Sequence, residues 1–262
     1  MSSPSLYDYP EIYDSVRAPD SETFESIYNL ICSQLGRRPQ SVMDPACGPA
    51  TWLAQFAREG IMVAGNDICE SMIAAAQEKC NGQALEFKVG DMLDLRLSTG
   101  PYEVVFELAG TCGMLSNERD FRKLLGSIVE HTAQNGLILL TVFFDDGRYD
   151  HYPWLVGEWG PFSIKSGGKA WLRYEVLSSD MKRNIDRVRR TVKTIDVDGC
   201  CPNLVDEYDM FSWKEEHFWN VVGEYRDLEF ITAFQYDEPS GISSSPRGDF
   251  IGETTVVFRK RG

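Results

Sequence analysis

The chain has 262 residues, of which 43% are hydrophobic, 25% charged and 12% aromatic. Such a composition is typical of a globular α/β protein with a sizeable core, and it excludes a disordered chain. The formal net charge of −14 opposes binding to nucleic acids and to anionic membranes, so we expect a small-molecule ligand.

Up to residue 144, helix-like and strand-like segments alternate along the chain. A helix with apolar residues at helical spacing begins near Asp20 or Ser21. The strands expected after it are 41–44, 62–66, 85–89, 102–108 and 137–144, with helices at about 51–59, 70–79 and 117–133 between them. This alternation predicts a Rossmann-like, doubly wound α/β fold in which helices cover a mostly parallel sheet.

After residue 144 the pattern changes, because strand-like segments follow one another without long helices. Expected strands are 173–177, 187–197 and 206–211, and such neighbours pair most simply as antiparallel strands. A helix at about 213–225 and strands at 228–236 and 250–258 end the chain. The basic runs at 187–190 and 259–261 are interpreted as solvated strand edges.

These patterns divide the chain into three expected parts. They are a Rossmann-like core at 1–145, an inserted antiparallel β cap at 146–211, and a segment at 212–262 that completes the core sheet. Seven cysteines without a Cys-x-x-Cys pair predict neither a disulfide framework nor a metal site. The longest apolar run is too short to cross a membrane and the N-terminus lacks a secretory signal, so we expect a cytoplasmic protein.

The stretch VMDPACGPAT, residues 42–51, carries the first sign of a ligand site. A tight turn from strand into helix presents backbone N–H groups and a helix N-terminus to an anionic group. Gly48 leaves room for the ligand to come close. The dinucleotide fingerprint G-x-G-x-x-G is incomplete, however, because the turn begins Ala46-Cys47-Gly48 and no third glycine follows.

Acidic residues also end the next two expected strands. Asp67 follows the second strand, where a carboxylate can accept hydrogen bonds from both hydroxyl groups of a ribose. Asp91 and Met92 follow the third strand and suit the amino group and the face of an adenine. Because the carboxyl ends of parallel strands meet at one edge of a sheet, we expect these side chains to surround one adenosine.

Residues 7–145 resemble the class I S-adenosylmethionine-dependent methyltransferases. VMDPACGPAT resembles their first motif, residues 63–72 (VAGNDICESM) their second, Gly90-Asp91-Met92 their adenine-binding motif, and 104–108 their fourth strand. The expected cap is similar to that of sugar N-methyltransferases and glycine N-methyltransferase-like enzymes. Ala46 and Ala50 stand where the family commonly has glycine, and Cys69 where serine is common.

The resemblance implies that S-adenosyl-L-methionine is the cofactor and that it donates a methyl group by direct displacement to a nitrogen or oxygen of a small-molecule acceptor. It implies that Asp67 binds the ribose, that Asp91 and Met92 bind the adenine, and that the backbone of 46–48 binds the methionine moiety. The full expected cofactor set is Tyr13, Asp44, Ala46, Gly48, Thr51, Asp67, Ile68, Met72, Asp91, Met92 and Glu107.

Aromatic residues and a histidine after the fifth strand are candidates for the acceptor site, since ligands of a parallel sheet bind at this edge. Tyr149 and His151 are the candidate catalytic residues, and His151 would be a general base for a hydroxyl acceptor. A surface position without a catalytic role is an equally good interpretation of His151. A nicotinamide-dependent oxidoreductase and a non-catalytic cofactor-binding protein remain alternatives, and the acceptor and the choice between monomer and homodimer stay open.

Overall fold

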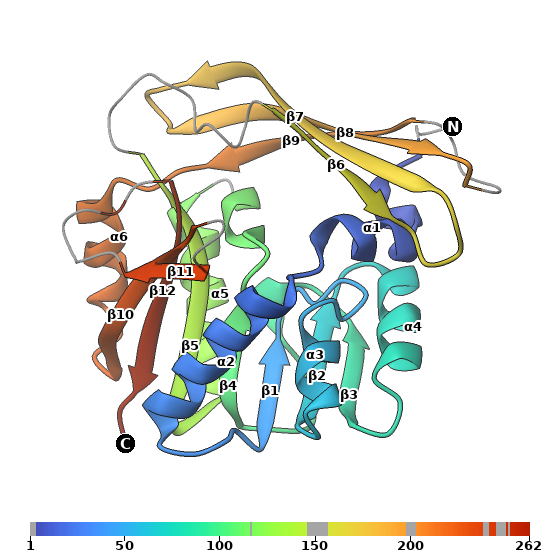
Figure 1. Ribbon diagram of the computed structural model, residues 1–262. Coiled ribbons are helices and arrows are strands. Elements are labelled where there is room, and N and C mark those ends of the chain that lie inside the picture. Colours follow the sequence, from blue (N-terminus) through green and yellow to red (C-terminus); the bar gives the residue numbers. More distant parts are fainter. Residues whose placement is uncertain are drawn as a thin grey trace.

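The computed structural model describes residues 4–115, 117–145, 157–197, 203–237, 241–244, 250 and 252–262. A large sheet with helices on both faces forms the body of the molecule, and a smaller sheet lies across one end of it (Figure 1). The N-terminal helix α1 (Pro10–Arg17) lies between the two sheets. The predicted fold class, a doubly wound sheet with an added antiparallel sheet, is confirmed.

The large sheet has the strand order β11-β10-β12-β5-β4-β1-β2-β3. Its strands are β1 (Ser41–Asp44), β2 (Met62–Asp67), β3 (Ala84–Val89), β4 (Tyr102–Glu107), β5 (Thr132–Phe144), β10 (Leu228–Asp237), β11 (Gly241–Ser244) and β12 (Gly252–Lys260). The first five strands pair in parallel, whereas β12 runs antiparallel to both β5 and β10. The carboxyl ends of the parallel strands and the beginning of β12 therefore share one edge.

Helices pack on both faces of this sheet. Besides α1 they are α2 (Ser21–Leu35), α3 (Leu53–Arg58), α4 (Glu70–Lys79), α5 (Glu118–His131) and α6 (Glu215–Val222), with short 3-10 turns η1 (Leu6–Asp8), η2 (Met92–Asp94) and η3 (Thr111–Met114). The start of α2 agrees with the sequence, since the Asp20 carboxylate accepts a hydrogen bond from Thr23 N–H at 2.7 Å and caps the helix. Phe56 and Phe106 belong to one apolar core, and Phe121 and Trp213 belong to the core on the other face.

The small sheet is antiparallel, with the order β6-β7-β8-β9. Its strands are β6 (Gly157–Ser163), β7 (Lys169–Asp180), β8 (Ile185–Ile195) and β9 (Asn203–Phe211). The interpretation of 187–190 as a solvated strand edge is wrong, because β8 lies between β7 and β9. Side chains alternate along β8, so Arg187 and Arg189 are partly exposed and pair with acids of β9, whereas Arg190 is 2% exposed.

Two strands were not predicted from the sequence. β6 contains Gly157, Gly160 and Pro161, which weaken a strand signal but suit its place at an edge of the small sheet. β11 lies between the two strands expected at 228–236 and 250–258. The division of the chain into core, cap and completing segment at 145 and 211 remains a proposal.

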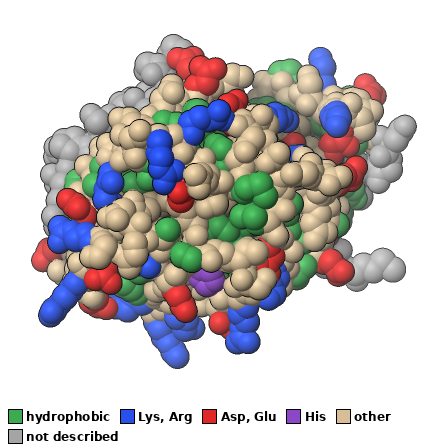
Figure 2. Space-filling view, turned by 90° about the horizontal axis from the view of Figure 1, so that it is seen from below, with side chains coloured by type: hydrophobic (Ala, Val, Ile, Leu, Met, Phe, Trp, Pro, Cys, Tyr) green, Lys and Arg blue, Asp and Glu red, His purple; other side chains and the backbone are tan. Residues whose placement is uncertain are grey.

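Figure 2 shows the face that lies below in Figure 1, at the end of the molecule opposite the small sheet. Acidic and basic side chains intermingle around its rim, with hydrophobic side chains between them. This mixture fits a solvated surface. In the part of the chain that the structure describes, none of the helices has the length and apolar character needed to cross a membrane.

Candidate active site

The turn after β1 is shaped by its own side chains. Asp44 is buried, and its carboxylate accepts a hydrogen bond from Ala46 N–H at 2.9 Å. Gly48 has a φ of 53°, and a Cβ added to it would lie 3.3 Å from Cε1 of Tyr13. Glycine is therefore favoured here, both by the left-handed backbone and by the close approach of Tyr13. Ala50 has a φ of 59°, so this alanine also occupies the left-handed region that favours glycine.

Asp67, at the end of β2, reaches back to this turn. Its Oδ2 accepts a hydrogen bond from Gly48 N–H at 2.8 Å, and its Oδ1 accepts one from Cys69 N–H at 2.9 Å. Burial raises the pKa of Asp67 against the effect of these N–H groups. Each carboxylate oxygen retains a lone pair, so the pair of hydroxyl groups of a ribose can bind here. Ile68 follows with 78% of its surface exposed and is available to an apolar ligand face at the same edge.

Asp91 lies at the end of β3 and caps η2 by accepting a hydrogen bond from Leu93 N–H at 2.9 Å. Met92 packs partly against the second core. Asn66, which the sequence reasoning did not include, joins the loops after β1 and β3 because its Nδ2 donates to Pro45 O at 3.0 Å and to Gly90 O at 2.9 Å. The sequence did contain a signal for Asn66, because a polar amide stands in an otherwise apolar strand. In the structure this side chain is buried, with 1% of its surface exposed.

The remaining residues of the expected cofactor set have their side chains in the protein interior. Both oxygens of Glu107 accept hydrogen bonds from backbone N–H groups of residues 109, 111 and 112, at 2.9–3.1 Å, so Glu107 shapes the loop after β4. Met72 is fully buried and Thr51 nearly so. Burial, with Glu107 and Asp67 nearby, raises the pKa of Asp44 well above its usual range. Tyr13 is buried, which raises the pKa of its hydroxyl and keeps it protonated.

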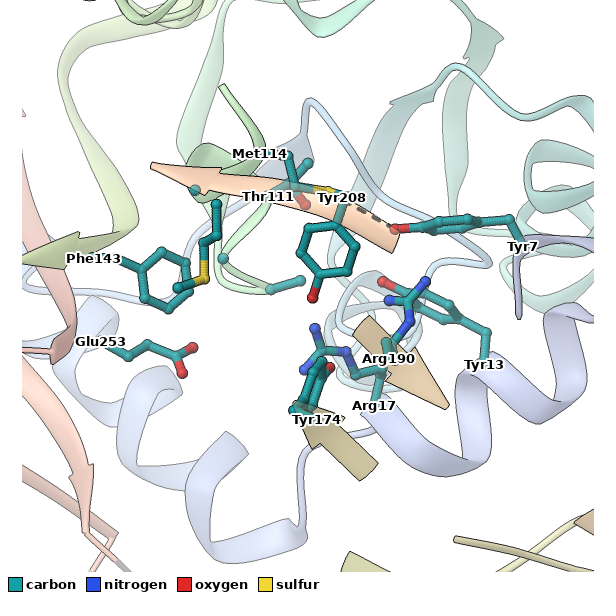
Figure 3. A pocket seen from close by; sticks show the side chains of 14 residues that line it. Tyr7, Tyr13, Arg17, Thr111, Met114, Phe143, Tyr174, Arg190, Tyr208 and Glu253 are labelled. Carbon is teal, nitrogen blue, oxygen red and sulfur yellow. Dashed lines mark hydrogen bonds between the residues drawn. The ribbon is translucent and has the colours of Figure 1, made fainter. Parts of the chain in front are cut away.

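A cavity of about 60 Å³ adjoins this edge, between α1, the loop after β4 and the small sheet (Figure 3). Tyrosine rings form much of its wall, and the other lining groups include two arginines, one carboxylate and apolar side chains. The lining tyrosine and charged residues are Tyr7, Tyr13, Tyr174, Tyr208, Arg17, Arg190 and Glu253. They come from distant parts of the sequence, which is why sequence reasoning did not find Arg17, Arg190 or Glu253.

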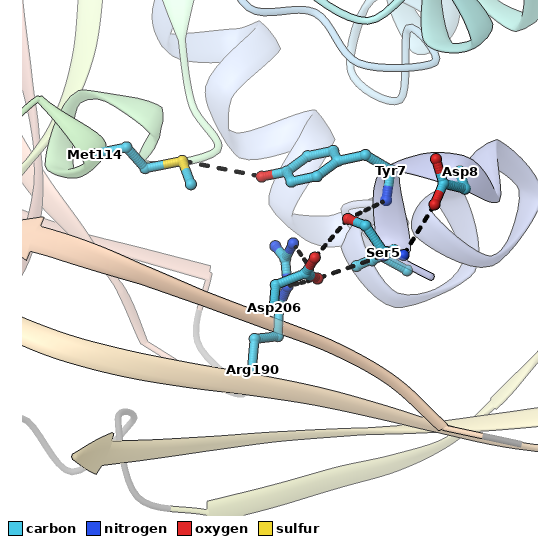
Figure 4. A network of polar contacts seen from close by, with 7 residues as sticks. Ser5, Tyr7, Asp8, Met114, Arg190 and Asp206 are labelled. Carbon is cyan, nitrogen blue, oxygen red and sulfur yellow. Dashed lines mark hydrogen bonds and ion pairs between the residues drawn. The ribbon is translucent and has the colours of Figure 1, made fainter. Parts of the chain in front are cut away.

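Arg190 is held in the cavity wall by a polar network (Figure 4). Its guanidinium group forms an ion pair with Asp206 at 2.8 Å and lies 4.9 Å from the centre of the Tyr7 ring. Asp206 also accepts hydrogen bonds from the hydroxyl of Ser5 and, at 3.4 Å, from Leu6 N–H. The Tyr7 hydroxyl approaches Met114 Sδ at 3.9 Å. The N-terminal segment is thereby tied to the small sheet and to η3.

The same N-terminal segment also covers the edge of the large sheet where the expected cofactor residues lie, here called the cofactor edge. Tyr7 O accepts a hydrogen bond from the Ser71 hydroxyl at 3.2 Å, which joins η1 to the start of α4. Lys79 of α4 forms an ion pair with Asp14 of α1 at 2.6 Å. The candidate catalytic residues Tyr149 and His151 lie outside the described residues, so their roles stay predictions.

The fold and the site together define a class of protein. In a class I methyltransferase the first strand of a parallel sheet is expected to end in a glycine turn and the second in an aspartate bonded to that turn. The sheet of this protein has both features, and a small cavity adjoins the same edge. Residues 42–136 match the family model described as "Methyltransferase domain".

Relatives by sequence include the dTDP-3-amino-3,4,6-trideoxy-alpha-D-glucopyranose N,N-dimethyltransferase of Streptomyces venezuelae, which is 24% identical over 71% of this chain and 70% of its own length. The dTDP-4-amino-2,3,4,6-tetradeoxy-D-glucose N,N-dimethyltransferase of Saccharopolyspora spinosa is 24% identical over 51% of this chain. A putative methyltransferase of Geobacillus is 27% identical over 46% of it. The chain spans about half the length of these last two relatives, 53% and 50% respectively.

Solved structures extend the similarity of fold to nearly the whole chain. The amino pentose methyltransferase CalS10 from Micromonospora echinaspora, solved with bound S-adenosylmethionine, has a TM-score of 0.71 at 15% identity, over 97% of this chain and 96% of its own. The sugar N-methyltransferase KedS8 from Streptoalloteichus has a TM-score of 0.71 at 16% identity, over 100% and 95%. Residues 42–136 therefore match a methyltransferase domain, and nearly the whole chain shares the fold of S-adenosylmethionine-dependent methyltransferases. The predicted resemblance and the predicted cofactor agree with these findings.

Proposed function

We propose that the protein transfers the methyl group of S-adenosylmethionine to an amine nitrogen of a small, sugar-like acceptor that also carries a negative charge. The observation that carries this proposal is the tyrosine-lined cavity beside the Gly48–Asp67 turn, with cationic and anionic side chains in the same wall. A cavity lined by groups of both charges suits a small molecule that carries both charges.

Methyl transfer from a sulfonium is a direct displacement that needs no covalent protein intermediate. The nitrogen lone pair forms the new N–CH3 bond while the S–CH3 bond breaks, and its electron pair stays on sulfur. The protein contributes by aligning nitrogen, methyl carbon and sulfur and by keeping water out. The small sheet and the N-terminal segment, which form walls of the cavity, are suited to this exclusion.

We assign the ribose to Asp67, the adenine to Ile68, Asp91 and Met92, and the methionine moiety to the backbone of residues 46–48. The hydrogen bonds of Asp67 to the turn support the first assignment, since they hold the carboxylate at the ligand edge. Tyr13 lies against Gly48 and lines the cavity, so we place it between the methyl donor and the acceptor.

The acceptor is assigned from the cavity and from the acceptors of two relatives. Two of these relatives are named as N,N-dimethyltransferases of amino sugars carried on dTDP. Arg17 and Arg190 give the cavity a positive side that suits a phosphoryl or other anionic group of such an acceptor. Nitrogen is favoured over oxygen because an amine becomes nucleophilic after losing one proton, without a strong base.

Incubation with S-adenosylmethionine labelled in its methyl group tests this function. The acceptor panel contains dTDP-3-amino-3,4,6-trideoxy-α-D-glucose, dTDP-4-amino-2,3,4,6-tetradeoxy-D-glucose, their hydroxyl counterparts and amino sugar phosphates. We expect labelled product from amines alone, identified by mass spectrometry. Label only on hydroxyl acceptors would contradict the nitrogen assignment. Stabilisation by NADH but not by S-adenosylhomocysteine in thermal denaturation would favour an oxidoreductase instead.

A cytoplasmic location also remains a proposal. In the described part of the chain, Cys32, Cys47, Cys69, Cys80 and Cys112 are free thiols, as expected in a reducing compartment. Tyr149 and His151 remain candidates for the acceptor wall.

A further inference from the structure

Glu253 brings a carboxylate to the cavity from the start of β12. Its position pairs with Phe143 of β5, so it lies at the edge where the parallel strands end. A Cβ built on Gly110 would lie 3.7 Å from Glu253 Oε1, which places the carboxylate beside the loop after β4. Figure 3 shows this side chain entering from the side opposite Arg190, with its oxygens directed into the cavity.

This carboxylate differs from the other acids near the site. Asp67 and Glu107 accept backbone hydrogen bonds, and Asp206 pairs with Arg190. Glu253 has neither a hydrogen bond nor an ion pair with any residue that the structure describes. A carboxylate that lines the cavity without a protein partner is free to bind a ligand group, so we infer that its partner is supplied by the ligand.

The charges around Glu253 indicate what that partner is. Burial raises the pKa of Glu253; Arg17 on α1 opposes this shift, and Glu107 on β4 adds to it. The other titratable groups lining the cavity are Arg190 and tyrosines. A protonated amine offers several N–H donors and a positive charge to the carboxylate, whereas a hydroxyl offers one donor and no charge.

We propose that Glu253 binds the ammonium form of the acceptor amine and takes up its proton before methyl transfer, so that it selects amines over alcohols. This inference rests on the proposed function. In the step, one N–H bond of the ammonium breaks, an O–H bond forms on the carboxylate, and the released lone pair attacks the methyl carbon. The proton passes to water when the product leaves, which restores the carboxylate.

A cofactor analogue tests this without knowledge of the acceptor. Sinefungin carries a protonated amine where the sulfonium bears its methyl group, whereas S-adenosylhomocysteine carries nothing there. Calorimetry on the full chain compares the two Kd values in wild type and in Glu253→Gln. We expect the preference for sinefungin over S-adenosylhomocysteine to fall at least about tenfold in Glu253→Gln, the effect of losing one charge-assisted hydrogen bond.

The control is Glu229→Gln, the same change on the neighbouring strand β10, where Glu229 is exposed and pairs with Arg261 at 3.5 Å. It should leave both Kd values unchanged. An unchanged sinefungin preference in Glu253→Gln overturns the inference. Failure of wild type to bind S-adenosylhomocysteine would instead overturn the proposed function, so the two failures are distinguishable.

Should Glu253→Gln fail to fold, the wild-type protein still provides the test. The sinefungin preference must decrease as the pH falls and the carboxylate is protonated, and a pH-independent preference overturns the inference. Turnover gives a second measurement: with dTDP-3-amino-3,4,6-trideoxy-α-D-glucose, Glu253→Gln should raise KM for the amine and leave KM for S-adenosylmethionine unchanged. Glu253→Asp, which keeps the charge, should recover part of the loss.

Discussion

Gly48 is the residue at which the cofactor turn tolerates least change. Its φ of 53° and the 3.3 Å separation between an added Cβ and the Tyr13 ring both penalise any other residue. We expect Gly48→Ala to weaken binding of S-adenosylhomocysteine at least about tenfold, which is ~1.4 kcal/mol of binding free energy, as measured by calorimetry. Gly36, a left-handed helix cap with open space around it, gives a matched control. Gly36→Ala should lower stability and leave the Kd unchanged.

Asp67 is the residue on which the ribose assignment depends. Asp67→Ala removes the oxygens that receive Gly48 N–H and Cys69 N–H and that we assign to the ribose hydroxyls. Cofactor affinity should fall at least about tenfold, because hydrogen bonds to charged groups contribute roughly 1.5–3 kcal/mol. Asp94→Ala, at an exposed aspartate paired with Arg96, is the control and should bind normally. Unchanged calorimetric affinity in Asp67→Ala would remove the basis for the assignment.

Among structural elements, β9 provides the clearest comparison of a buried and an exposed ion pair. Asp206 pairs with the buried Arg190, whereas Asp209 on the same strand pairs with the exposed Arg187. Asp206→Ala leaves an unpaired buried charge, so we expect a loss of roughly 3–5 kcal/mol in the free energy of unfolding. Asp209→Ala should cost less than about 1 kcal/mol. Urea denaturation of both variants measures the difference, and equal losses would contradict this account of the network.

The comparison of sequence and structure is also clearest at this scale. The alternating strands and helices up to residue 144 were predicted because buried parallel strands and amphipathic helices have distinct apolar patterns. The cofactor turn was predicted because Asp44, Gly48 and Asp67 are close in sequence to the strand ends that place them. The predicted helix at 213–225 is longer than α6, which spans Glu215–Val222. The prediction was too long because aromatic residues stand beyond each end, at 213 and 225.

The cavity could not be predicted in the same way. Arg17, Arg190 and Glu253 meet only because α1, β8 and β12 converge in three dimensions, and no local pattern marks such a meeting. Arg190 was misread as solvated because a run of three arginines in four residues resembles an exposed strand. Only the register of β8 between two neighbouring strands shows which side chains face inward.

For the whole molecule, the buried acids predict opposite effects of pH on stability and on cofactor binding. Burial raises the pKa of Asp44, Asp67 and Glu253 in the folded state. The folded protein therefore binds more protons than the unfolded chain between the ordinary and the raised pKa values, and its stability decreases as pH rises through that window. The net charge of −14 acts in the same direction.

Lowering the pH from about 7.5 to 6 should thus raise the Tm of the ligand-free protein. The rise should be about 2–4 °C for each ~1 kcal/mol gained in the free energy of unfolding. The additional stabilisation by S-adenosylhomocysteine should shrink as the pH falls toward the raised pKa of Asp67, because a protonated Asp67 accepts fewer hydrogen bonds from a ribose. Thermal denaturation across this range, with and without the ligand, measures both effects. In Asp44→Asn the rise in Tm should be smaller. A Tm that falls in parallel with and without ligand would contradict the expectation.

The N-terminal segment covers the cofactor edge through Tyr7 and Ser71 and also forms one wall of the acceptor cavity. Under the proposed function, we therefore expect that spent cofactor is not exchanged while that wall keeps its shape around an acceptor. For an acceptor amine that can take two methyl groups, the proposed function then predicts release after the first transfer, so that dimethylation would be distributive. Free monomethylated product should accumulate before the dimethylated one when acceptor is in excess.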